Sequence, residues 1–248
     1  MISEFALFLF TLLGGIAAGA YTFAWAYPEG EGAKRWLLPG VSLVLLAIGG
    51  LALLLHLGHP ERMLYAFSNP NAGITREGLA TGLFGVLVLV DFIVALRTGK
   101  SLPKALGIVT AVAGVLLLLA MGSAYIQFYG VPAWGNWTSM LLFVVGGLSV
   151  GVLALPLFDA AIARNNAFAI CAAVVNALFA CSAVATGAHF ASLGLSIVPF
   201  VCAAVAAIAA AVVAWFAKGR QGVAFPALAF LLAVVAVIVA RYAFYMVV

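Results

Sequence analysis

Two short polar segments interrupt an otherwise apolar chain. The first is His56-Leu57-Gly58-His59-Pro60-Glu61-Arg62, and the second is Thr75-Arg76-Glu77. They carry two histidines, two glutamates and two arginines in a chain that is 67% hydrophobic and only 7% charged. Ionisable groups beside hydrocarbon are costly unless they pair, face water or meet a ligand. An imidazole next to a carboxylate can accept protons and pass them on.

Three further residues have types that fit such chemistry. Tyr125 ends an apolar run, Arg241 lies inside the last one, and Tyr245 follows one turn later on the same helix face. If the helices bundle, these three residues lie with His56 and Glu77 at one depth near one surface. Each of these residue types also has a possible structural role. A histidine can lie at the membrane interface, a glutamate can complement a helix dipole, tyrosines can belong to the aromatic belt, and an arginine can snorkel to the membrane surface.

The apolar runs predict an all-α integral membrane protein with about eight transmembrane helices. A span needs roughly 20 mostly apolar residues. The runs are too long for barrel strands and lack the alternation of such strands. We expect one transmembrane domain over residues 1–248, with a retained first helix rather than a cleaved signal. The expected spans are 5–27, 36–58, 77–97, 104–125, 138–158, 166–186, 197–217 and 224–247.

The basic residues predict the orientation of the helices. Eight lie in the odd-numbered connections and only Arg62 and Arg76 lie in the even-numbered ones, which indicates that the odd connections are cytoplasmic. Both termini are then on the outer, periplasmic side of a bacterial or archaeal inner membrane. The net charge of +4 therefore reflects a lipid bilayer partner and not nucleic acid. The eight residues are Lys34, Arg35, Arg97, Lys100, Lys104, Arg164, Lys218 and Arg220.

The cysteines do not form a metal-binding pattern. Cys171, Cys181 and Cys202 all lie inside expected spans, and none belongs to a C-x-x-C pair. We therefore expect no iron–sulfur cluster or zinc site in this chain. Small packing residues are the plain interpretation of all three.

Four motifs are spread over nearly the whole chain. They are His56-Leu57-Gly58 with Pro60, Arg76-Glu77 with Ala80-Thr81-Gly82, Val131-Pro132-Ala133-Trp134 with Trp137-Thr138, and the closing Arg241-Tyr242-Ala243-Phe244-Tyr245. Together, and in this order, they resemble a known family, the membrane-anchor subunits of dimethyl sulfoxide reductase-type molybdoenzymes (DmsC-like anchors).

The resemblance implies a role in anaerobic respiration. Such anchors hold a four-cluster iron–sulfur subunit and a molybdopterin catalytic subunit at the membrane. They bind a quinol, usually menaquinol, near the outer face and pass its electrons to the nearest cluster. The quinol-site histidine of the family falls on His56 and its acidic partner falls on Glu77. The correspondence of the remaining candidates, Tyr125, Arg241 and Tyr245, is looser.

One position departs from the family pattern. A second histidine, His59, follows Gly58, which leaves open whether His56 or His59 contacts the quinol. The acid–base chemistry fits either residue, because a neutral imidazole can accept a proton from a quinol hydroxyl. Glu77 can orient the imidazole or relay the proton to water, and Arg241 can stabilise negative charge on the ring.

Three other functions remain alternatives at this level. A stand-alone transporter or channel is compatible with eight helices that carry ionisable groups. A haem b anchor can draw its ligands from His56, His59 and His189, although the resemblance implies no haem. A purely structural anchor is the third. If the chain anchors such a complex, the terminal substrate of the complex depends on the catalytic subunit.

Overall fold

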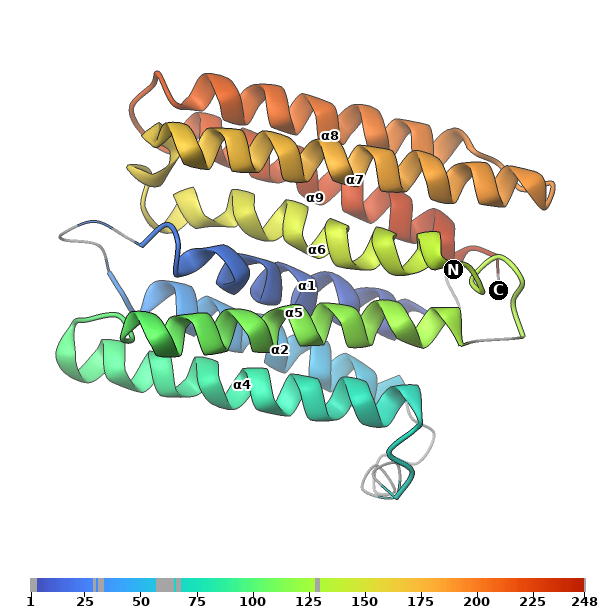
Figure 1. The fold of residues 1–248 in the computed structure, drawn as a ribbon, viewed down its shortest axis with the longest axis horizontal. Helices are drawn as coiled ribbons and strands as arrows, with labels where there is room; N and C mark the ends of the chain where they lie inside the picture. Colours follow the sequence, from blue (N-terminus) through green and yellow to red (C-terminus); the bar gives the residue numbers. More distant parts are fainter. Residues whose placement is uncertain are drawn as a thin grey trace.

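Eight long helices form the structure. The computed structural model describes residues 4–28, 30, 34–56, 65, 68–127 and 130–247, without the side chains of residues 55 and 56. Within these ranges eight helices are long and apolar enough to cross a membrane, which confirms the expected all-α bundle. They are α1 (Phe5–Ala24), α2 (Leu37–His56), α4 (Gly73–Thr98), α5 (Lys104–Ile126), α6 (Trp137–Phe158), α7 (Asn166–Ser192), α8 (Val198–Ala217) and α9 (Ala224–Tyr245), with the short 3₁₀ helix η2 (Ile162–Arg164) before α7 (Figure 1).

Two helix boundaries differ from expectation in a way that matters for the site. Helix α4 begins at Gly73, so Glu77 lies one turn inside it and does not open it. Helix α7 continues to Ser192, so His189 lies on a helix and not in a connection. Hydropathy marks only the apolar part of a span, whereas a helix continues through polar residues that keep its backbone hydrogen bonds.

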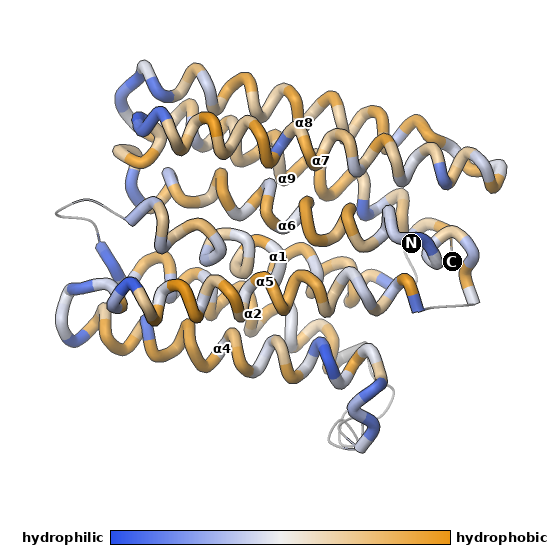
Figure 2. The backbone as a smooth tube through the Cα atoms, in the orientation of Figure 1, coloured by the Kyte–Doolittle hydropathy of each residue, from blue (hydrophilic) through white to orange (hydrophobic). Residues whose placement is uncertain are grey.

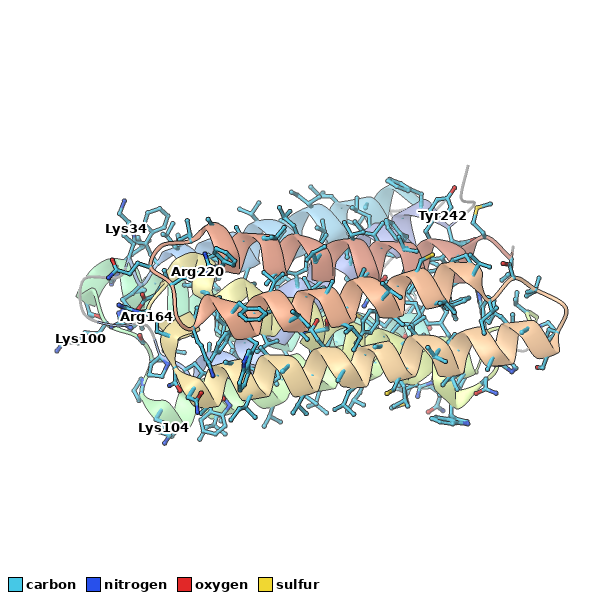
Figure 3. The ribbon with its side chains drawn as sticks, turned by 90° about the horizontal axis from the view of Figure 1, so that it is seen from above. Lys34, Lys100, Lys104, Arg164, Arg220 and Tyr242 are labelled. Atoms are coloured by element: carbon cyan, nitrogen blue, oxygen red, sulfur yellow. The ribbon has the colours of Figure 1, made fainter. Side chains whose placement is uncertain are left out.

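The two ends of the bundle have different chemistry. Both chain termini lie at one end (Figure 1), and polar residues gather at the ends of the helices (Figure 2). Lys34, Lys100, Lys104, Arg164 and Arg220 lie together at the opposite end, whereas Tyr242 lies near the termini (Figure 3). We call these the terminal end and the basic end. The membrane side that each end faces remains a prediction.

The helices form two four-helix units with the same packing order. In the first unit α1 packs against α2 and α5, and α4 packs against the same two helices. In the second unit α6 packs against α7 and α9, and α8 packs against those two. Helices α1, α2, α4 and α5 thus correspond to α6, α7, α8 and α9. The units meet mainly where α1 lies against α6, at the centre of the bundle (Figure 1).

A glycine seam brings α1 and α6 into backbone contact. Both helices carry two adjacent glycines and a third glycine one turn later, at Gly14-Gly15 with Gly19 and at Gly146-Gly147 with Gly151. A methyl group added to Gly19 would lie 2.0 Å from the carbonyl oxygen of Gly147. One added to Gly151 would lie 2.1 Å from the carbonyl carbon of Gly19. Such small residues permit close packing where apolar burial gives no driving force.

Small residues also allow the helices of the second unit to pack closely. Helix α8 turns a row of alanines inward, and α9 does the same from the other side. Helices in lipid associate by van der Waals contact, so alanine faces allow their backbones to approach. The buried alanines of α8 are Ala203, Ala204, Ala207, Ala210, Ala211, Ala214 and Ala217, and those of α9 are Ala229, Ala233, Ala236 and Ala240.

We expect Gly151→Ala to destabilise the protein strongly, by about 3 kcal/mol or more, because the new methyl group must push two backbones apart. Gly85→Ala is the matched control, since nothing lies within 4 Å of the methyl group it adds. Thermal unfolding of both variants in detergent checks this. Equal melting temperatures for Gly151→Ala and the wild type would show that the seam does not hold the units together.

Candidate functional site

A cavity of about 430 Å³ opens at the terminal end, between the first turns of α1 and α4 and the last turn of α5. Glu77 contributes the carboxyl group of its wall, and Tyr125 and Trp134 contribute aromatic rings. The volume falls within the range of small-molecule sites, about 300–1,000 Å³. The lining residues are Glu4, Leu7, Gly73, Ile74, Glu77, Ala124, Tyr125, Gln127 and Trp134.

Glu77 is buried at this wall. Its side chain is 7% exposed, and no hydrogen bond to its carboxyl group is found within the described residues. The backbone of the same turn is ordinary helix, since the Thr81 hydroxyl donates to the Glu77 carbonyl oxygen at 2.7 Å. A buried carboxyl group without a protein partner is costly, so a ligand or water in the cavity is its natural partner.

Two tyrosines link the helix units behind the cavity. The hydroxyl groups of Tyr125 and Tyr245 are hydrogen-bonded to each other, and the Tyr245 oxygen also lies 3.5 Å from the Thr11 hydroxyl oxygen. Both side chains are buried, but only Tyr125 lines the cavity. The two residues end corresponding helices, α5 and α9. Their contact therefore lies where the units meet.

Arg241 lies deeper than the tyrosines and is 1% exposed, so the snorkelling interpretation is wrong. Its Nη2 donates to the carbonyl oxygen of Phe143 at 3.2 Å, and its guanidinium carbon lies 4.8 Å from the centre of the Phe143 ring. Its Nε and Nη1 have no hydrogen-bond partner within the described part of the chain. The structure thus holds a positive charge in an apolar interior, directly behind the tyrosine pair.

An aromatic cluster fixes the geometry of the pair. The Trp134 indole N–H donates to the carbonyl oxygen of Phe244 at 2.9 Å, and the two rings stack with centres 5.3 Å apart. Tyr125 stacks on Phe143 at 4.5 Å and meets the edge of Trp134 at 5.5 Å. Aromatic contacts of this kind are specific in geometry as well as favourable. They leave the tyrosine rings little freedom.

The structure brings together four of the six candidate residues. Glu77 lies close enough to both tyrosine hydroxyls to interact with them electrostatically, and Arg241 lies against the same pair. The side chains of His56 and His59 lie outside the described residues, although the backbone of His56 ends α2 at the terminal end. Arg76 is not among the described residues that line the cavity, but it holds one of them, because its guanidinium bonds the Asn71 carbonyl oxygen at 2.9 Å and the Gln127 side chain.

Sequence reasoning missed several members of the site. Trp134 was recognised only as part of a motif, and its place in the cavity wall follows from the packing of its connection against α9. Thr11 carried no signal, because a lone threonine in an apolar helix usually bonds its own backbone, as Thr11 does with Phe8 at 3.2 Å. Glu4 and Gln127 also line the cavity from helix ends.

Asp91 lies outside the candidate site. The structure pairs it with helix α1, where the Tyr21 hydroxyl donates to its carboxylate at 2.7 Å. The residues between Glu77 and Asp91 on the buried face of α4 are Phe84 and Val88, both fully buried and apolar. The two carboxyl groups are therefore separate sites.

The second unit has a cavity in the corresponding position, with a different lining. It measures about 420 Å³ and lies between the start of α8 and the end of α9. Its lining carries no carboxyl group; its polar members are Ser196 and Tyr242. His189, at the end of α7, corresponds to His56 at the end of α2, and its Nδ1 lies 3.3 Å from the Asn136 amide nitrogen. Of these two cavities, only the one in the first unit has a carboxyl group among its described lining residues.

These features define a polytopic helical membrane protein with a ligand-sized polar cavity near one end of its bundle. The chain belongs to the DMSO reductase anchor subunit (DmsC) family, whose model matches residues 1–247. This confirms the resemblance carried by the four motifs.

Three curated proteins, all named as parts of anaerobic dimethyl sulfoxide reductases, are similar in sequence. The one from Haemophilus influenzae is 30% identical over 161 residues, which cover 59% of this chain and 57% of that protein. In Escherichia coli, the protein YnfH is 29% identical over 192 residues, covering 73% and 66%, and a second such protein is 32% identical over 169 residues, covering 62% and 58%. The matched region thus spans less than two thirds of each relative's length.

Arg241→Met should leave the melting temperature unchanged or raise it, because it replaces a buried, incompletely bonded cation with an apolar side chain of similar length. The protein already uses this residue at the corresponding place, since Met121 precedes Tyr125 by one helical turn. Thermal unfolding in detergent measures the effect, and Phe143→Ala, expected to cost about 3–5 kcal/mol, is the reference for a structural loss. A comparable loss in Arg241→Met would make Arg241 a structural residue.

Proposed function

We propose that the terminal-end cavity binds a quinol and that this chain anchors a molybdopterin oxidoreductase complex, accepting electrons from the quinol for a partner iron–sulfur subunit. One observation carries the proposal: a buried carboxyl group without a hydrogen-bond partner among the described residues forms part of a cavity wall whose other members are mainly apolar and aromatic, with Glu4 and Gln127 at helix ends. Family membership supports the anchor role. The names of the three similar proteins support a dimethyl sulfoxide reductase-type complex.

The cavity fits the shape and polarity of a quinol. Leu7, Ile74 and Ala124 offer apolar walls, while Tyr125 and Trp134 offer flat faces for a ring. Ile74 is 44% exposed on the outside of the bundle, so an isoprenoid tail can leave the cavity along α4 into lipid.

Each residue of the cavity has a role in this proposal. Oxidation of a quinol releases two electrons and two protons. Glu77 accepts a hydrogen bond and then a proton from one hydroxyl, and it passes the proton to water at the terminal end. Tyr125 hydrogen-bonds a ring oxygen from the cavity wall. His56, at the end of α2, receives the second hydroxyl proton, with His59 as the neighbouring alternative.

Tyr245 and Arg241 act from behind the wall. Neither lines the cavity, so neither contacts the ring in this proposal. Tyr245 fixes the orientation of the Tyr125 hydroxyl through their hydrogen bond. Arg241 supplies a positive potential in a low-dielectric interior, where charge acts strongly. It therefore favours negative charge on the cavity side during deprotonation.

The partner subunits dock at the terminal end in this proposal. The positive-inside bias puts that end on the periplasmic side of the inner membrane. A four-cluster iron–sulfur subunit there places a cluster near the cavity, and a molybdopterin subunit completes the complex. Menaquinol is the proposed donor. The terminal acceptor depends on the catalytic subunit.

Glu77→Gln should lower quinol-driven turnover of the assembled complex by about 10²-fold or more, because the amide keeps the shape of the side chain and cannot take a proton. Turnover with an artificial electron donor to the catalytic subunit should stay unchanged. Asp159→Asn is the matched control, since this carboxylate caps Gly30 at the basic end, at 2.7 Å from its nitrogen. Wild-type quinol turnover in Glu77→Gln would refute the role of Glu77.

The two corresponding histidines provide an internal comparison. His56→Ala should abolish quinol oxidation without preventing assembly, whereas His189→Ala should retain it, because the cavity beside His189 has no carboxyl group in its lining. Quinol-dependent reduction of the terminal acceptor, with subunit content checked on the purified complex, measures both. Equal losses in the two variants would argue against a site confined to the first unit.

A further inference from the structure

A second polar pocket lies at the basic end of the bundle. It has a volume of about 220 Å³ and lies between the end of α1, the start of α2, the end of α4 and the start of α5. Its buried walls are apolar and aromatic, with Tyr21, Leu38 and Leu155 each less than a tenth exposed. Its exposed rim includes Trp25 and Lys104. An amphipathic ligand fits such a lining.

Two cations stand at the rim. Arg35 donates from Nη1 to the Ser101 hydroxyl at 3.3 Å and from Nη2 to the Gly30 carbonyl oxygen at 2.8 Å. These bonds hold its guanidinium group over the pocket, between α2 and the α4–α5 connection. The Lys104 ammonium, which also belongs to the lining, lies 5.7 Å from the centre of the Trp25 ring. A phosphate between them would meet both charges.

The pocket contains one carboxylate, which already has protein partners. Asp91 accepts hydrogen bonds from the Tyr21 hydroxyl, at 2.7 Å, and from the backbone N–H of Leu102. A carboxylate has about four acceptor positions, so two such bonds leave capacity for a ligand hydroxyl. Among the described residues of the lining, the charges of Asp91, Arg35 and Lys104 sum to one positive charge.

We infer that this pocket binds the headgroup of an anionic glycerophospholipid of the phosphatidylglycerol type. Arg35 and Lys104 hold the phosphate, and Asp91 and Ser101 accept hydrogen bonds from the glycerol hydroxyls. Basic pockets between transmembrane helices are suited to anionic headgroups. The net positive charge of the lining matches the single negative charge of this lipid.

The surroundings favour a lipid over a free phosphate ion. Trp25 and Trp36 are 40% and 42% exposed at the ends of α1 and α2, as expected for tryptophans at a membrane interface. From the pocket, α2 presents an exposed apolar face toward the membrane interior, on which acyl chains can lie. This face consists of Val41, Val44, Ile48 and Leu51.

A lipid in this pocket would connect α4 and α5 with the α1–α2 connection. Its phosphate contacts residues of the α1–α2 connection and of α5, while its glycerol contacts α4. Binding to the folded protein alone raises its stability by linkage. The lipid would also fix the basic end in the membrane leaflet that carries anionic lipids.

The test measures the melting temperature of the purified full chain in detergent with added phosphatidylglycerol, phosphatidylethanolamine, phosphatidylcholine or inorganic phosphate. Arg35→Gln/Lys104→Gln removes both rim charges. Lys34→Gln/Lys100→Gln removes the same charge from the same end outside the pocket and is the matched control. We expect phosphatidylglycerol to raise the melting temperature of wild type and control, with an affinity about tenfold or more weaker in the pocket variant.

Other outcomes overturn the inference. Equal weakening in both double variants would mean that the lipid senses the overall charge of the basic end. An equal response to phosphatidylethanolamine would remove the headgroup assignment, and an equal response to inorganic phosphate would make the site a free-anion site. If the pocket variant does not fold, Lys104→Gln alone replaces it, since this side chain is exposed. A wild type that responds to none of the lipids also refutes the site.

Discussion

The backbone contact between α1 and α6 is the constraint on which the rest of the structure depends. Two glycines on each helix, Gly15 and Gly19 on α1 and Gly147 and Gly151 on α6, allow the two four-helix units to approach until Gly19 and Gly151 touch. That approach brings the ends of α5 and α9 together, so that Tyr125 meets Tyr245. Any side chain on the seam would separate the units and the tyrosines with them. The contact between these glycines of α1 and α6 at the centre of the bundle thus contains no polar side chains, yet it determines how the polar residues are arranged at the terminal end.

The buried arginine shows how the two units differ in chemistry despite their common packing order. Its counterpart in the first unit is a methionine, which fills space without needing partners. Arg241 instead carries charge into a region where two of its nitrogens find no acceptor among the described residues. Such a charge contributes little to stability. The free-energy cost of burying this charge is easiest to explain if the residue belongs to a functional site.

The asymmetry between the units extends to their cavities. Both have an opening at the terminal end, between their third and fourth helices. Only the first unit lines this opening with a carboxyl group, and only the second supplies the arginine behind it. The candidate site therefore needs both units. The opposite end carries a separate pocket with its own charges, so the two ends can bind different ligands.

The sequence predicted the fold class and the eight long apolar helices found in the described part of the chain, because hydropathy over about 20 residues is a local property. It also named four residues that the structure brings together: Glu77, Tyr125, Arg241 and Tyr245. It also identified the family, through motifs whose order a sequence displays directly. It did not place Trp134 or Thr11 in the site, and it left Arg241 as a residue that could reach the membrane surface. Only the tertiary structure decided that Arg241 faces inward, that Tyr245 lies behind Tyr125, and that Asp91 pairs with Tyr21. The physical reason is that these facts depend on which helix lies beside which, and the close approach of two glycine faces fixes that arrangement across more than a hundred residues of sequence.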